Sequence, residues 1–268
     1  MEALNCTFCF KGPRILKETP GYLLAYKPPK MHSVPLRGSG GSLTGWCASF
    51  FPEILDIRGV KAGEGGLLHR LDYETCGVVL IARNQETYES LWKQQQDGGI
   101  VKEYCALVCR ASRVLSGFPQ RPFGFPPEGA AFVESFFRPY GPGRKEVRPL
   151  NPEQKGVKET AADKGNPYCT EIAEVLKEQD LPFGEEIFRC RIRIRRGFRH
   201  QIRCHLAWIG FPVLNDPVYA GTGEPGGFLA LMARGIAFQD PESGRELEYA
   251  VQDHASLPEI LRRISAAR

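Results

Sequence analysis

Residues 67–82 read Leu67-Leu68-His69-Arg70-Leu71-Asp72-Tyr73-Glu74-Thr75-Cys76-Gly77-Val78-Val79-Leu80-Ile81-Ala82. The apolar run near the end of this stretch, 78–81, has the length of a buried strand. The half before it is polar and contains His69, Arg70, Asp72 and Thr75. Charged groups next to a buried strand cost free energy unless each is paired. The stretch therefore predicts either a structural ion-pair corner or an active site.

The composition is that of an ordinary globular protein, with 42% hydrophobic and 25% charged residues in a chain of 268. No apolar run reaches the length of a membrane span, and the first residues lack the charged and apolar blocks of a signal peptide. We therefore expect a cytoplasmic protein with no membrane partner. The net charge of +4 permits a polyanionic partner but does not require one.

The nine cysteines are scattered through the chain and form no compact framework. An odd number in a chain without a signal peptide favours reduced thiols. Cys6 and Cys9 have the spacing of half a zinc site, but no second pair with ligand spacing follows. We therefore expect no metal.

Capping residues predict two helices in the first half of the chain. Asn84 is a good N-cap and apolar residues follow it at helical spacing, so we predict a helix from about Gln85 to Gln96. Ser42 likewise predicts a helix, whose inner face carries Trp46 and Phe50. Both helices are expected to contribute apolar side chains to a core.

The middle of the chain changes character after a clear strand. Alternation along 101–109 predicts a strand with Lys102 and Tyr104 on the same face. Residues from about 119 to 168 are rich in proline and glycine, and they predict two flexible excursions joined by short strands around 132–137. At the far end, about 257–267, we predict a short amphipathic helix.

A strictly alternating segment, 188–195, predicts a strand with one basic face. That face carries Arg189, Arg191, Arg193 and Arg195. Four arginines in a row repel one another unless a polyanion neutralises them, which favours nucleic-acid binding. The other interpretation is an edge strand that its charges protect against aggregation.

The segment after this strand predicts a helix that begins near residue 201. Ile202 and Leu206 mark one helical face, and Gly210 is a natural C-terminal stop. Gln201 and Arg203 fall in the first turn, where backbone N–H groups and side chains can bind an anion.

Three motifs occur along the chain in the order known from one family. They are His69-Arg70-Leu71-Asp72-x-x-Thr75-x-Gly77, Lys102-x-Tyr104-x-Ala106 and His200-Gln201-Ile202-Arg203-x-His205-Leu206. Tyr26-Lys27-Pro28 precedes them, and Asn215-Asp216-Pro217-Val218-Tyr219 follows. From about Gly21 to Val251 the chain resembles the RluA-type pseudouridine synthases.

The resemblance implies an α+β fold with a mostly antiparallel mixed sheet, flanked by helices and loops, and an active-site cleft across the sheet. We expect residues 1–268 to form a single catalytic domain, with a family-like core at about 21–251. We expect no N-terminal S4-like RNA-binding domain, and we expect the protein to be a monomer.

The resemblance also implies an enzyme that isomerises specific uridines to pseudouridine in structured RNA, ribosomal or transfer, without a cofactor. Asp72 matches the catalytic aspartate of the family, Tyr104 its active-site tyrosine, and Arg203 the arginine that pairs with that aspartate. Arg70 matches a residue that in some members fills the gap left by the flipped base.

These residue types suit the chemistry. The target base must leave the stack, which costs a few kcal/mol that contacts to the RNA must offset. An ionised carboxylate is then needed, and a buried Asp72 stays charged when a cation such as Arg203 lies beside it. Tyr104 offers a flat ring for the detached uracil and a phenol that can move a proton.

The remaining candidate RNA-binding residues come from the same motifs and from the arginine strand. They are His69, Thr75, Lys102, Arg199, His200, Gln201, Leu231, Arg191 and Arg193.

Three single positions and one short stretch depart from the family pattern. Cys76 replaces a serine, Met232 a histidine and Asn215 a glycine, and 196–199 reads Arg-Gly-Phe-Arg where Thr-Gly-Arg-Thr is usual. The loss of an arginine at 198 predicts a change in how the site holds RNA. Because Asp72, Tyr104 and Arg203 are all present, we expect activity.

Two other functions remain open at this point. One is a catalytically silent RNA-binding protein, in which the departures around Phe198 have ruined the site. The other is a metal-dependent hydrolase that uses His69, Asp72, His200 and His205, although His200 and His205 do not share one helical face.

Overall fold

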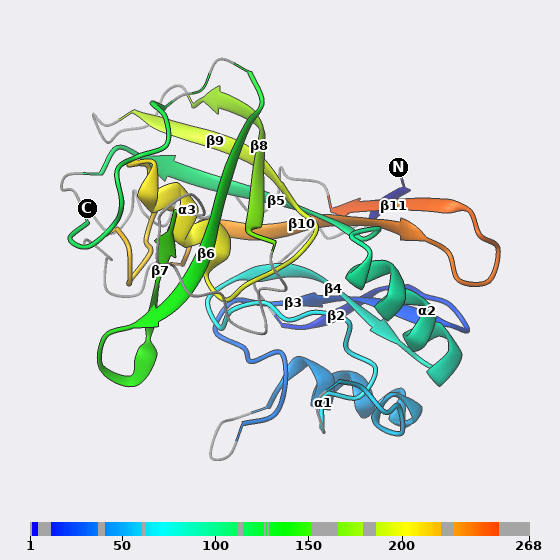
Figure 1. Cartoon of the computed structure of the whole chain (residues 1–268). Helices are drawn as coiled ribbons and strands as arrows, with labels where there is room; N and C mark the ends of the chain where they lie inside the picture. The colour runs from blue at the N-terminus through cyan, green and yellow to red at the C-terminus, as the bar shows by residue number, and fades with distance from the viewer. Residues whose placement is uncertain are drawn as a thin grey trace. The chain divides into compact units, whose positions relative to one another are not determined.

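The computed structural model describes residues 2–4, 12–36, 41–60, 63–111, 115–125, 127, 129–151, 166–178, 186–220 and 228–251 (Figure 1). Helices and strands are mixed along this part of the chain, which confirms the expected α+β class. The described residues form two compact units. One combines the chain up to Tyr104 with the chain from Met232, and the other comprises Cys105–Leu231. The Cys6 and Cys9 pair and the C-terminal helix predicted at 257–267 lie outside the described residues.

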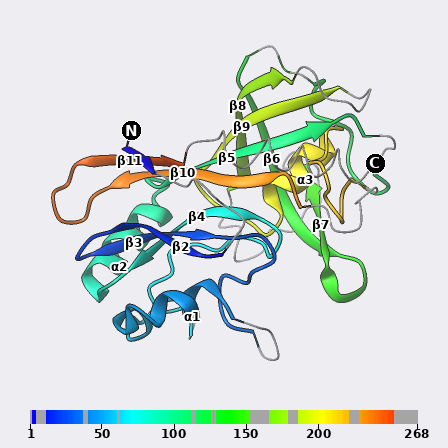
Figure 2. The same cartoon turned by 180° about the vertical axis from the view of Figure 1, so that it is seen from behind.

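The first unit contains a mixed set of paired strands. They are β1 (Glu2–Leu4), β2 (Arg14–Glu18), β3 (Tyr22–Lys27), β4 (Cys76–Ala82), β10 (Leu231–Gln239) and β11 (Glu246–Val251). The pairs β2–β3, β3–β4 and β10–β11 are antiparallel, whereas β4–β10 and β1–β11 are parallel. Figures 1 and 2 show β2, β3 and β4 side by side from opposite directions.

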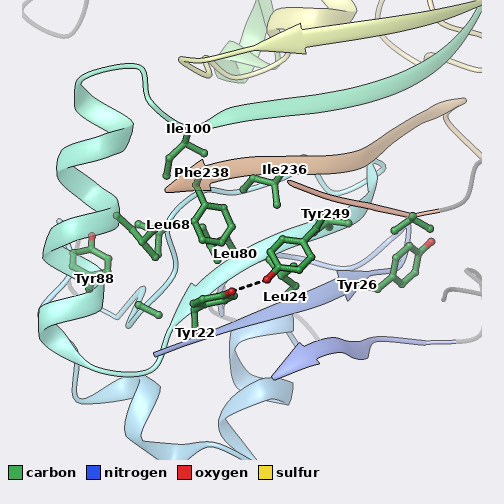
Figure 3. Packing of buried hydrophobic residues seen from close by; sticks show 14 of the residues in the cluster. Tyr22, Leu24, Tyr26, Leu68, Leu80, Tyr88, Ile100, Ile236, Phe238 and Tyr249 are labelled. Atoms are coloured by element: carbon green, nitrogen blue, oxygen red, sulfur yellow. Dashed lines mark hydrogen bonds between the residues drawn. The ribbon is translucent and has the colours of Figure 1, made fainter. Parts of the chain in front are cut away.

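The core of this unit lies on the face that β3 and β4 share. All side chains of β3 and β4 are buried, as the apolar run at 78–81 predicts. Figure 3 shows the core cluster, in which the hydroxyls of Tyr22 and Tyr249 form a hydrogen bond of 2.8 Å. The ring of Phe238 packs edge-on against Tyr22, with 5.2 Å between ring centroids.

Helix α2 (Gln85–Gln96) has the predicted bounds, because Asn84 caps it. The side chain of Asn84 accepts a hydrogen bond of 2.9 Å from the backbone N–H of Thr87. A side chain that satisfies an N–H group in the first turn fixes where a helix begins.

Helix α1 (Leu43–Ala48) begins at the predicted cap Ser42 but ends early, before the short 3-10 helix η1 (Pro52–Leu55). Phe50 lies beyond the last helical turn and is 60% exposed, so its assignment to the core was wrong. The reason is that helical spacing places a residue on the inner face only while the helix continues.

The second unit is built on antiparallel strands. These are β6 (Ala131–Tyr140), β7 (Glu146–Leu150), β8 (Tyr168–Lys177) and β9 (Ile187–Ile194), which pair in the order β9-β8-β6-β7. Helix α3 (Gln201–Trp208) follows β9, and η2 (Pro142–Arg144) lies between β6 and β7. Strand β5 (Val101–Cys109) carries the chain from one unit into the other.

The region predicted to be irregular is more regular than expected where it is described. Strand β6 covers ten residues and β7 pairs with it, so 131–150 forms a long hairpin. Proline and glycine had suggested loops, but Pro139 and Pro149 both lie within the paired strands. Cross-strand pairing therefore outweighs local composition here. Residues 152–165 lie outside the described residues.

Among the residues that the structure describes, no helix is both long enough and apolar enough to cross a membrane.

A glycine joins the polar motif to strand β4. Gly77 has a φ of 126° and pairs with Ala233 of the parallel strand β10. A Cβ atom at this position would lie 2.2 Å from the carbonyl oxygen of Ala233. Only glycine adopts this conformation and permits this close approach.

We predict that Gly77→Ala lowers the free energy of unfolding by about 3 kcal/mol, because it combines backbone strain with a backbone clash. The measurement is equilibrium denaturation in urea. Gly41→Ala serves as the control, since no atom of the described residues, apart from its chain neighbours, lies within 4 Å of the Cβ that it adds. Equal stability of the two variants would contradict the prediction.

Candidate active site

The polar motif of the first unit is a loop whose backbone is held on both sides of Asp72. The hydroxyl of Ser33 donates to the carbonyl oxygen of Leu71 (3.0 Å) and accepts from the N–H of Leu71 (3.1 Å). The ammonium of Lys27 donates to the carbonyl oxygen of Tyr73 (3.3 Å). Asp72 is therefore flanked by two residues whose main chains are fixed.

Lys27 is completely buried, and all three of its N–H donors have carbonyl partners. Besides Tyr73 these are Pro28 (3.0 Å) and Met31 (2.8 Å). Burial lowers the pKa of Lys27 to about 8, while nearby acidic groups, Asp72 among them, act to raise it. Its cationic form, which supplies all three donors, predominates at neutral pH.

Asp72 is partly exposed and begins a turn, since its carbonyl oxygen accepts from the N–H of Thr75 (3.2 Å). Tyr104 of strand β5 is buried. Its pKa is raised above the ordinary value, first by burial and then by the negative charge of Asp72. A neutral phenol therefore lies within the electrostatic influence of the candidate catalytic carboxylate.

Two further candidate residues, His69 and Lys102, interact electrostatically with each other. The imidazole of His69 accepts at Nε2 from the N–H of Leu80 (3.2 Å), which places its proton on Nδ1. Burial and then the charge of Lys102 lower the pKa of His69 to about 3, so the ring stays neutral. Its buried Nδ1 has no hydrogen-bond partner within the described part of the chain.

Lys102 lies buried on β5, on the same face as Tyr104 by alternation. It donates to Oε1 of Gln95 (3.2 Å), and Gln95 in turn donates to the carbonyl oxygen of Leu68 (2.9 Å). Burial lowers the pKa of Lys102 to about 8. The prediction that Lys102 and Tyr104 share one face agrees with this arrangement.

Thr75 and Arg70 differ in their surroundings. Thr75 is buried, and its hydroxyl has no hydrogen-bond partner among the residues that the structure describes. Arg70 has a half-exposed side chain and forms an ion pair with Glu64 at 3.0 Å. An exposed pair of this kind contributes little to stability and exchanges readily with other anions.

In the second unit, Arg203 on α3 is buried and bound at two points by Asp216. Its Nε lies 2.7 Å from Oδ2 of Asp216 and its Nη2 lies 2.8 Å from Oδ1. Asp216 also accepts from the N–H groups of Val218 (2.9 Å) and Tyr219 (3.1 Å). This fork fixes the direction of the guanidinium plane. Pairing of Arg203 with Asp72, which belongs to the other unit, stays a prediction.

The start of α3 is set by a strained residue and a side-chain hydrogen bond. His200 has a φ of 56°, and its Nδ1 lies 3.4 Å from the hydroxyl of Tyr219. Gln201 accepts at Oε1 from the N–H of Phe198 (2.9 Å) and donates to Thr170 (3.1 Å). Gln201 therefore ties the loop before α3 to strand β8.

Arg199 binds the turn between β6 and β7. Its Nη2 donates to the carbonyl oxygens of Arg144 and Glu146. Arg199 is exposed and thus also accessible from solvent.

The unusual Phe198 is part of an aromatic cluster. Its ring stacks on Phe137, with centroids 5.1 Å apart and planes at 13°, and meets Tyr168 edge-on at 5.1 Å. An arginine at position 198 would leave this cluster incomplete. The departure from the family pattern is therefore compensated by packing in this chain.

The arginine strand is correctly predicted as a strand, but its neighbours were not foreseen. Strand β9 lies between β5 and β8, so the edge-strand interpretation is wrong. The fourth arginine of the predicted face, Arg195, lies just beyond the end of β9. The three arginines within the strand pair with glutamates: Arg189 with Glu178 (2.9 Å), Arg191 with Glu174 (3.4 Å) and Arg193 with Glu171 (3.9 Å). Single-strand alternation shows the face that a residue occupies, not its partners on the next strand.

Leu231 and Met232 begin β10, and both are buried. Met232 pairs in register with Cys76, so two departures from the family pattern are neighbours in the parallel pair of β4 and β10. Both side chains belong to the apolar core cluster of the first unit. We interpret Cys76 and Met232 as two substitutions that pack against one another in the core.

Among the described residues, no group of three His, Cys, Asp or Glu side chains is placed to bind a metal ion. His205 is buried between two hydroxyls, with Nε2 2.9 Å from Ser135 and Nδ1 2.8 Å from Thr170. Burial lowers its pKa to about 3. Both ring nitrogens are thus engaged within the fold.

Sequence analysis did not assign a role to Lys27, Ser33 or Asp216. The signal for two of them was present, since Tyr26-Lys27-Pro28 and Asn215-Asp216-Pro217 were part of the recognised pattern. Ser33 had no signal, because only the fold brings it to Leu71.

The family model described as RNA pseudouridylate synthase matches residues 21–208. The chain is 25% identical over 250 residues to the uncharacterized RNA pseudouridine synthase YjbO of Bacillus subtilis. The matched region covers 93% of this chain and 74% of that protein. It is also 25% identical over 268 residues to ribosomal large subunit pseudouridine synthase D of Escherichia coli, covering 92% and 70%.

A solved structure shares the fold. Human RNA pseudouridylate synthase domain containing 1 has 18% sequence identity and a TM-score of 0.64, with 96% of this chain and 95% of that chain covered. Together with the order of the motifs around Asp72, Tyr104 and Arg203, the family match leads to one conclusion. The chain belongs to the RNA pseudouridylate synthase family, as an enzyme of the RluA type.

Proposed function

We propose that this enzyme isomerises specific uridines of structured RNA with Asp72 as its catalytic carboxylate, and that it needs no cofactor. The observation that carries the proposal is the fixed position of Asp72 between Leu71 and Tyr73, whose main chains Ser33 and Lys27 hold. Its negative charge also reaches Tyr104, whose pKa it helps to raise. A carboxylate so placed has a defined position without losing its access to solvent.

The reaction is balanced without an oxidant or a reductant. The bond between C1′ of the ribose and N1 of the base breaks, the base turns, and a bond from C1′ to C5 forms. The proton at C5 leaves, and N1 carries a proton in the product. Asp72 acts on the sugar or the base, or takes a proton from the sugar, and all three routes need its ionised form.

Tyr104 and Arg203 support this step. The phenol of Tyr104 is neutral because burial and the charge of Asp72 raise its pKa, so it can donate or relay a proton at neutral pH. Arg203, whose direction Asp216 sets, is proposed to pair with Asp72 and keep it charged.

The remaining motif residues are proposed to hold the RNA. The unpartnered Nδ1–H of His69 and hydroxyl of Thr75 are polar groups that a base or ribose can satisfy. Arg70 is proposed to fill the gap that the flipped base leaves. Proposed contacts to the backbone and the base are Lys102, Arg199, His200, Gln201, Leu231, Arg191 and Arg193.

Ribosomal RNA is the substrate class that we favour over transfer RNA. The support is the named activity of the Escherichia coli relative, which acts on the large ribosomal subunit. We further propose that the chain acts as a monomer in the cytoplasm, as a single catalytic domain with its core at about 21–251.

The decisive prediction concerns Asp72. Pseudouridine is mapped in total RNA from cells with the gene, cells without it, and cells that express Asp72→Asn. At least one site should disappear on deletion and stay absent in the variant, because an amide can act neither as a nucleophile nor as a base. Restoration of every site by Asp72→Asn would overturn the assignment, and so would a map that deletion leaves unchanged.

A second prediction concerns Arg203 and Asp216. Arg203→Leu should lower turnover by about a hundredfold or more, because the carboxylate then loses its cation. Asp216→Asn should lower turnover less, since the arginine keeps its charge but not its fixed direction. Turnover is measured as the release of tritium from C5 of uridine, and thermal unfolding tests whether each variant folds. Near-normal turnover in folded Arg203→Leu would contradict the pairing with Asp72.

A third prediction concerns the arginine strand. If Arg191 and Arg193 contact phosphates, their replacement by serine should flatten the dependence of log K on log salt by about one for each lost contact. Glu171→Gln with Glu174→Gln is the matched control, since it removes the partners but keeps the arginines. An unchanged slope in the serine variant would show that these arginines contact no phosphate and only pair with the glutamates of β8.

A further inference from the structure

Tyr73 directly follows Asp72, and it is 42% exposed. A large aromatic side chain therefore lies at the surface, one residue from the proposed catalytic carboxylate. Exposure of one aromatic residue is common and by itself carries no function. What distinguishes Tyr73 is the way in which it is held.

The main chain of Tyr73 is fixed by a buried cation. Its carbonyl oxygen accepts from the ammonium of Lys27 (3.3 Å), and the turn that contains it is closed by the hydrogen bond from Thr75 to Asp72 (3.2 Å). The ring therefore projects from an immobilised backbone and can contact a ligand with little loss of conformational freedom.

A second ring supports the first. The imidazole of His32 lies against Tyr73, with ring centroids 4.6 Å apart and planes inclined by 38°. His32 forms a parallel bridge with Ser42, and its carbonyl oxygen accepts from the N–H of Leu43 (2.9 Å). The next residue, Ser33, is bonded twice to Leu71.

The two backbone segments that carry these rings are thus cross-linked on both sides of Asp72. The result is a rigid, partly exposed aromatic pair that touches the candidate catalytic loop. Side chains of this kind bind single-stranded RNA by stacking, because every base has a flat π face. A base-flipping enzyme needs such a partner, since removal of one base leaves its neighbours unstacked.

We propose that Tyr73, backed by His32, is a stacking site for an unpaired RNA base that neighbours the target uridine. The inference rests on the proposed function and adds a binding residue to the same site. Stacking involves no phosphate, so it contributes to affinity to the same extent at every salt concentration.

The test compares the binding of a synthetic single-stranded oligouridylate by the full-length protein and by Tyr73→Leu. The leucine variant should bind about tenfold more weakly, with the salt slope unchanged, because the loss is one of stacking. Tyr73→Trp should bind at least as tightly as the wild type, and His32→Leu should show a smaller loss. Phe50→Leu, which removes another exposed ring of the first unit, should bind as the wild type does.

Catalysis gives a second readout. On RNA extracted from cells that lack the gene, the loss in Tyr73→Leu should fall on KM more than on kcat, since the ring acts in binding. Thermal unfolding checks that the variant is folded.

Equal oligouridylate affinity in wild type and Tyr73→Leu would overturn the proposal, and so would a wild type that does not bind this probe. A reduced salt slope in the variant would also overturn it, because the loss would then be electrostatic. Failure of the proposed function is recognised separately, as oligouridylate binding that depends on Tyr73 in a protein whose deletion removes no pseudouridine.

Discussion

The candidate site of the first unit depends on one buried ammonium group. Lys27 is fully buried, and its ammonium donates three hydrogen bonds to carbonyl oxygens, one of which belongs to Tyr73. A buried cation is costly unless every donor is satisfied. Here three hydrogen bonds to carbonyl oxygens offset the cost of burial, and the same bonds fix the main chain of the loop. Ser33 completes the arrangement at Leu71, and Asp72 lies between the two held residues.

Burial then decides the charge states around this loop. It keeps the phenol of Tyr104 and the imidazole of His69 neutral, and it lowers the pKa of Lys102 to about 8. Asp72 is the more exposed member of the set. A neutral phenol within the electrostatic influence of a more accessible carboxylate is an arrangement suited to acid–base chemistry at neutral pH.

Local signals were sufficient where a single residue determines an element. Asn84 caps α2 at the predicted residue, and Gly210, with a φ of 89°, follows α3 as expected. Prediction failed where a partner distant in sequence decides the outcome. Phe50 is exposed because α1 stops short, and Ser33 reaches Leu71 only through the fold. The motif pattern points to candidate site residues, but a pattern contains no information on which contacts hold them in place.

The glutamates opposite the arginine strand show how such long-range partners change an interpretation. Arg191 and Arg193 are paired with Glu174 and Glu171, yet all four side chains retain substantial exposure. Pairs of this kind contribute at most about 1 kcal/mol each. The glutamates therefore neutralise the arginines in the free protein. An anion that displaces a glutamate has to overcome only a weak ion pair. Because a phosphate can replace a carboxylate at such a pair, cross-strand pairing and RNA binding are compatible on β9 rather than alternatives.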